Sequence, residues 1–283
     1  MQRKFRYYYN AILRTIFMEY REIISDSIDY SRDALVGNWK TWLVFIICSL
    51  PFALMVFLFD PEKLAAGTVD WNAFPWVQFI ALILAGFLLS FFTSGYIVRV
   101  LRGTKPAPVF DHWGQLYLDG IKLMVVELLW IVPTSIILGA AFVFIMAFTG
   151  LGGMTSPVLR ILLVLLVSVA LIFAIVTILC IIPGFVRFAR TGSIREGVRG
   201  FALLNTVGAI GLGSYLLALV ILLAIVIVFF LLTSVLGLIP FIGWVIRLAL
   251  SPLIFVFSAR YVSRVYDHAA PPAPLVTEPV AGT

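Results

Sequence analysis

Six long apolar stretches constrain this chain more than any other feature of its sequence. Hydropathy windows of about 19 residues place them at residues 41–59, 76–98, 121–147, 158–182, 207–236 and 241–262. A helix can cross the hydrocarbon of a bilayer when roughly 20 consecutive residues are mostly apolar. Only 12% of the residues are charged, whereas a soluble domain has about 25%. The sequence therefore predicts an all-α integral membrane protein with six transmembrane helices.

The basic residues predict how these helices are oriented. Lysine and arginine are retained in the cytoplasm during membrane insertion, whereas acidic residues have little influence. In a six-helix arrangement, all of the 20 basic residues except Lys63, Arg160 and Arg247 fall on the side that holds both termini. We therefore expect a multi-pass protein of the cell membrane, with N- and C-termini in the cytoplasm and the helices arranged as three tandem hairpins.

Cytoplasmic segments are expected on both sides of this transmembrane domain, which covers residues 39–266. Residues 1–38 carry apolar side chains at helical spacing and predict amphipathic helices at the cytoplasmic surface or the membrane interface. The first of them, between Phe5 and Ile16, either lies in the headgroup plane or packs on the helix bundle. Residues 267–283 are rich in proline and hardly charged, which predicts a disordered cytoplasmic tail.

Each even-numbered apolar stretch ends in two arginines about one helical turn apart, and we call these six residues the exit arginines. They are Arg99 and Arg102, Arg187 and Arg190, and Arg260 and Arg264. Cytoplasmic amphipathic segments follow the first two pairs, at residues 110–120 and 193–204. The pattern indicates three diverged copies of one hairpin unit, although any cytoplasmic helix end attracts arginine. The exit arginines are also candidates for binding anionic lipid headgroups, each contributing about 1 kcal/mol.

A short acidic segment precedes the third apolar stretch. Asp111, Gln115 and Asp119 share one face if the segment is helical, with Trp113 beside them. That face can hold a cation or a positively charged partner. Alternatively, Asp111 caps the surface helix and Asp119 pairs with the arginines that leave the second or fourth stretch. In that case Asp111, Trp113 and Asp119 form a structural motif at the cytoplasmic side.

Glu127 is the candidate for an intramembrane functional residue. It lies about six residues, or roughly 9 Å, into the third stretch, where a charge costs on the order of 2.5 to 3.5 kcal/mol. The carboxyl is either functional or hydrogen-bonded to a neighbouring helix. Arg247 can pair with it only if the bundle brings their depths together, and otherwise extends to the outer interface.

Three segments carry a resemblance to a known family. They are Asp33 to Trp42 (DALVGNWKTW), Gly95 to Gly120 (GYIVRVLRGTKPAPVFDHWGQLYLDG) and Phe185 to Phe201 (FVRFARTGSIREGVRGF). Together they resemble the domain-of-unknown-function 4013 family, a largely archaeal set of membrane proteins, from about Asp33 to Asp267. The family has no established activity, so the resemblance implies a fold and no mechanism.

Residues for catalysis are scarce. His112 and His268 cannot build a metal site alone, and no HExxH, GxSxG, Walker or GxGxxG pattern occurs. We therefore expect no catalytic residues, no metal, no cofactor and no nucleic-acid partner. The expected function is a non-enzymatic scaffold or partner-binding module, whose partners are membrane lipids and a second copy or another membrane protein. The alternative is a transporter or channel for a lipid or small solute, with Glu127 in its pathway.

Overall fold

The computed structural model describes residues 20–59, 66–68, 70–150, 157–237, 239 and 242–268, without the side chains of 148–150. The predicted N-terminal helix between Phe5 and Ile16 and the proline-rich tail lie outside these residues, apart from the start of the tail. Every regular element in the described part is helical, and six helices are long and apolar enough to cross a membrane. The chain is therefore a multi-pass helical membrane protein.

The helices follow one another with short connections. A helix over residues 20–35 comes first. After it come α2 (Trp39–Leu54) with the 3-10 helix η1 (Met55–Leu58), α4 (Trp76–Leu101), α5 (Trp113–Gly150), α6 (Pro157–Thr191), α7 (Ile194–Gly197), α8 (Gly200–Ile210), α9 (Leu212–Gly237) and α10 (Gly243–Asp267).

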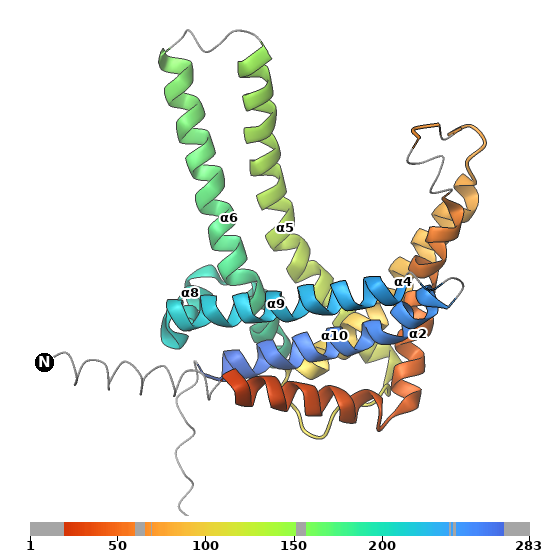
Figure 1. Ribbon diagram of the computed structural model, residues 1–283. Helices are drawn as coiled ribbons and strands as arrows, with labels where there is room; N and C mark the ends of the chain where they lie inside the picture. The colour runs from red at the N-terminus through yellow and green to blue at the C-terminus, as the bar shows by residue number, and fades with distance from the viewer. Residues whose placement is uncertain are drawn as a thin grey trace, which may run out of the picture.

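The six long helices form three hairpins that share one base. The hairpins are α2 with α4, α5 with α6, and α9 with α10, and the base is the region where α4, α6 and α10 end. In Figure 1, α5 and α6 rise side by side from the base, whereas α9 and α10 run across the view and the helix of residues 20–35 lies beside α10. The hairpins diverge away from the base, so their common packing is concentrated there.

Helix α10 is the central helix of this base. In its most apolar 18 residues, 44% of the residues are buried. The corresponding share is 11% in each of α5, α6 and α9. It packs on α9, α4, α2 and α6. Its buried side chains include Val256, Ala259 and Tyr261. Helix α10 is thus inserted into the base, while the outer parts of α5 and α6 keep their apolar surface exposed.

Helices α4 and α5 cross at backbone contact. A methyl group added at Gly95 would lie 1.9 Å from the carbonyl oxygen of Leu116, and one added at Gly120 would lie 2.0 Å from that of Phe91. Both glycines are the ends of the longest segment that carries the family resemblance. Their missing side chains allow the two helix backbones to approach this closely.

Two predicted boundaries are wrong. The amphipathic segment at residues 110–120 and the third apolar stretch are one continuous helix, α5, which begins at Trp113. The fifth stretch was expected over residues 207–236, but the helix is interrupted at Gly211, whose φ of 91° ends α8 before α9 begins at Leu212. Hydropathy alone does not show the break at Gly211, because the segments on both sides of it are apolar.

Candidate functional site

The three hairpin ends are joined at the base in a closed circuit. One exit arginine of each hairpin donates a hydrogen bond to a backbone carbonyl in the exit of the next hairpin, and we call these three residues the arginine ring. The bonds run from Arg102 Nε to Ala189 O (3.0 Å), from Arg190 Nη2 to Ser263 O (3.3 Å) and from Arg260 Nη1 to Gly103 O (3.3 Å). The end of the first hairpin thus binds the end of the second, the second binds the third, and the third binds the first.

All six exit arginines also have a carboxylate partner in the described part of the chain. The pairs are Arg99 with Asp111, Arg102 with Asp119 (2.6 Å), Arg187 with Glu196 (2.5 Å), Arg190 with Asp267 (2.6 Å), Arg260 with Asp26 (2.8 Å) and Arg264 with Asp26 (3.4 Å). A lipid headgroup at these arginines would have to compete with a carboxylate that is already bound. Headgroup binding by the exit arginines stays a prediction.

Asp26 is the acidic residue on which the third exit depends. Its carboxylate accepts from Arg260 and Lys105, and the side chain of Arg260 is only 2% exposed, stacked over the ring of Tyr30 at 4.6 Å. Burial disfavours the charged form of Asp26, but the hydrogen bonds from Arg260 and Lys105 outweigh it, so the pKa of this carboxyl lies below its ordinary value.

Sequence reasoning missed Asp26. The sequence holds only a weak signal: Ile23 and Tyr30, each about one helical turn from Asp26, are apolar or aromatic, and the structure buries both. An acidic side chain one helical turn from such residues is directed toward the protein interior. The identity of its partner, 234 residues further along the chain, has no signal in the sequence.

For the acidic segment before α5, the structure contradicts one of the two predictions and confirms part of the other. Asp111 is not on the helix, since α5 begins at Trp113, so Asp111 shares no helical face with Asp119 and does not cap α5. Its carboxylate binds Arg99, and that hydrogen bond holds the pKa of Asp111 below its ordinary value. Asp119 pairs with Arg102 of the second apolar stretch, which is one of the two alternatives predicted for it.

Trp113 belongs to an aromatic stack beside these ion pairs. Its ring stacks on Phe110 with centroids 5.6 Å apart, and Phe110 stacks in turn on the buried Tyr96 at 4.8 Å. The stack fixes the loop between α4 and α5 against the base. The described structure therefore gives Asp111, Trp113 and Asp119 structural contacts.

Glu127 is exposed on the outer surface of α5. It lies one turn before Trp130, whose indole Nε1 donates to the carbonyl of Gly197 in α7 at 3.1 Å. Its carboxyl is therefore beside the base and not midway along the hairpin. Among the described residues no ion pair joins it to Arg247, which lies near the opposite end of α10.

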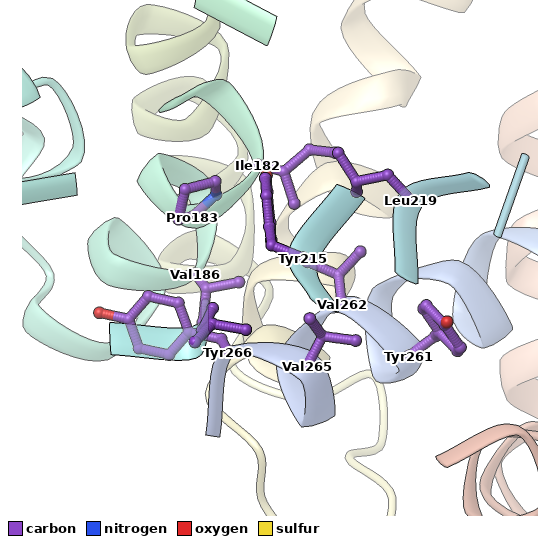
Figure 2. Close-up of a pocket in the computed structure, with 10 residues that line it drawn as sticks. Ile182, Pro183, Val186, Tyr215, Leu219, Tyr261, Val262, Val265 and Tyr266 are labelled. Carbon is purple, nitrogen blue, oxygen red and sulfur yellow. The ribbon is translucent and has the colours of Figure 1, made fainter. Parts of the chain in front are cut away.

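The interior next to the arginine ring is closely packed. Figure 2 shows the side chains around a cavity of about 10 Å³, where α6, α9 and α10 meet. Pro183 has no backbone N–H, so the carbonyl of Leu179 one turn earlier lacks its helical donor, and the Tyr215 hydroxyl donates to it at 3.1 Å. Glu127 lines neither this cavity nor the larger ones of the α9–α10 hairpin.

The described residues contain no group of three or more His, Cys, Asp or Glu that can hold a metal ion.

Comparison with known proteins gives a family match. The model of a family described as "Protein of unknown function (DUF4013)" matches residues 78–238, more than half of the chain. Two of the three segments that carry the resemblance, Gly95 to Gly120 and Phe185 to Phe201, lie inside this region. No curated protein and no solved structure matches the chain.

Proposed function

The chain belongs to the DUF4013 family, and from that premise we propose that it is a non-enzymatic membrane scaffold, in which one rigid base holds three hairpins in contact with lipid. In this proposal the base faces the cytoplasm, and the hairpins present fixed apolar surfaces to the bilayer and to a partner in it.

The observation that carries the proposal is the closed arginine ring. Moving one hairpin relative to the other two would break two guanidinium–carbonyl bonds, one to each neighbour. At Arg260 it would also separate a cation that is 2% exposed from its carboxylate. Removing one partner of a buried ion pair costs roughly 3 to 5 kcal/mol. A transporter that alternates between two states needs its repeats to rock against each other, and this base opposes such motion.

The outer surfaces of the hairpins support lipid contact. Side chains over a broad face of α6 are more than half exposed, among them Val164, Leu165 and Ile172. So are Ile136 and Phe142 on α5. Apolar area of this extent is stable only when hydrocarbon or another apolar surface covers it.

Transport through a pathway that contains Glu127 is the alternative function. It would require a polar route that reaches this carboxyl. Glu127 is exposed on the outside of α5 and lines none of the cavities named above, which favours the scaffold.

The rigidity of the base can be measured directly. Spin labels at Val143→Cys on α5 and Val245→Cys on α10, both exposed, report the separation of two hairpins when the buried Cys48 and Cys180 are replaced by alanine. In lipid nanodiscs we expect one narrow distance distribution, independent of lipid composition. Two populations that exchange with conditions would contradict a fixed scaffold.

A flux assay distinguishes the two functions. We expect liposomes that contain the protein to release trapped dye, potassium or protons no faster than protein-free liposomes. Glu127→Gln should leave the yield of folded protein unchanged, because substitutions at exposed sites usually change stability by less than about 0.5 kcal/mol. A flux that wild type supports and Glu127→Gln abolishes would establish the transport alternative.

A further inference from the structure

The α9–α10 hairpin contains two cavities large enough for a ligand. One of about 410 Å³ lies between α2, η1, α9 and α10, and one of about 400 Å³ lies between the helix of residues 20–35, α9 and α10. Pockets for small ligands typically have volumes of roughly 300 to 1,000 Å³. Phe229 and Ile254 line both cavities, so the two spaces adjoin at these side chains.

The two cavities differ in their polar content. The one beside residues 20–35 has mostly apolar walls, including Ile24, Ile28 and Phe257, with Ser31 and the exposed Arg32 as its polar lining residues. The one beside α2 combines apolar and aromatic walls with a charged residue, Arg247, near the turn between α9 and α10. Together the two cavities offer an amphiphile a basic residue, Arg247, near the α9–α10 turn and mostly apolar walls beyond it.

Arg247 differs from the exit arginines in its surroundings. Its side chain lies across Gly237, and no carboxylate among the described residues is within ion-pair distance. The hydroxyls of Thr233 and Ser251 in the same cavity donate to carbonyls of their own helices, each at 2.9 Å. Arg247 is therefore the charged donor that this cavity offers to an anion.

We propose that the two cavities together bind one membrane lipid with an anionic phosphate headgroup. The phosphate pairs with Arg247, and one acyl chain passes Phe229 and Ile254 into the apolar cavity beside residues 20–35. A small soluble anion would leave the apolar walls in contact with water, and an uncharged chain would leave Arg247 without a counterion. The inference rests on the proposed lipid-contacting function and names the lipid class and its site.

The walls also favour an anionic over a zwitterionic lipid. No residue that lines either cavity is acidic, so the cationic part of a choline headgroup would find no partner, while its phosphate would gain the same contact. A single basic residue contributes about 1 kcal/mol to the binding of anionic lipid, which corresponds to about a fivefold change in affinity.

The test compares four variants in nanodiscs of phosphatidylglycerol and phosphatidylcholine, with lipids that remain bound after extraction counted by native mass spectrometry. Arg247→Gln removes the headgroup contact, and Arg160→Gln, at an exposed arginine of α6 outside both cavities, is its control. Val56→Trp fills the cavity from an exposed position on η1, and Val143→Trp, at a similarly exposed position on α5, is its control.

We expect wild type and both controls to retain one phosphatidylglycerol selectively. Arg247→Gln should lower that retention about fivefold, and Val56→Trp should abolish it. Equal retention in all variants would overturn the proposal, and so would a loss with Arg247→Gln but not with Val56→Trp, because the lipid would then lie outside the cavity. If the scaffold proposal is correct, the spin labels report one narrow distance distribution whether or not the lipid is retained. The lipid-site proposal and the scaffold proposal can therefore be refuted separately.

Discussion

Replacing Asp26 with asparagine tests whether the base depends on a buried ion-pair node. The side chains of Asp26 and Arg260 are 17% and 2% exposed and approach to 2.8 Å, and Lys105 and Arg264 share the same carboxylate. Complete loss of one partner of a buried pair costs roughly 3 to 5 kcal/mol. The asparagine oxygen still accepts one hydrogen bond from the guanidinium of Arg260, and a hydrogen bond to a charged group contributes about 1.5 to 3 kcal/mol, so part of this cost is recovered. We therefore expect Asp26→Asn to lower the free energy of unfolding by about 2 to 3 kcal/mol.

Equilibrium unfolding in mixed micelles, followed by far-ultraviolet circular dichroism, measures this loss. The matched control is Asp33→Asn, the same substitution at an exposed acid of the same helix, for which we expect a change below about 0.5 kcal/mol. If Asp26→Asn destabilises the protein no more than Asp33→Asn, the carboxylate does not hold the third hairpin and the argument for a rigid base fails.

The same node predicts a pH dependence. The pKa of Asp26 is lower in the folded protein than in the unfolded chain, so its carboxylate stabilises the fold above the unfolded pKa of about 3.9. This contribution is lost as the pH falls through the lower, folded value. The stability difference between wild type and Asp26→Asn should therefore be constant above about pH 5 and shrink below about pH 4. A difference that persists unchanged into the acidic range would show that the charge of Asp26 has no role.

Two further predictions concern helix packing. Gly120→Ala should lower the free energy of unfolding by about 3 kcal/mol, because its methyl group would overlap the Phe91 carbonyl oxygen. Gly114→Ala on the same helix meets no atom within 4 Å and should not destabilise the protein. Equal yields of folded protein for the two variants would refute the close crossing. Tyr215→Phe should cost about 1 kcal/mol by removing the donor to Leu179 O, and thermal unfolding in detergent measures it. In a Pro183→Ala background, where the new N–H serves that carbonyl, the cost should disappear, and an equal loss in both backgrounds would contradict this role.

The sequence alone predicted the membrane class, the six long apolar helices and the three hairpins, because each depends on local hydropathy and length. The same local reasoning identified the exit arginines and limited the partners of Asp119 to the arginines that leave the second or the fourth stretch. Its partner is Arg102, only 17 positions away in the chain. Local reasoning was wrong about where helices begin and end. Asp111 is outside α5, and the apolar run around Gly211 contains a break.

Only the tertiary structure decided which groups meet at the base. Asp26 and Arg260 are separated by 234 residues, and the ring bond from Arg260 to Gly103 joins the third hairpin to the first. Such contacts depend on how three hairpins pack against one another, and no periodicity within a single segment specifies that packing. Burial likewise made Arg260 an interior cation while leaving Glu127, in a more apolar stretch, on the surface. Hydropathy sets the environment a helix prefers, but the side that each charged residue faces is fixed by the helices packed against it.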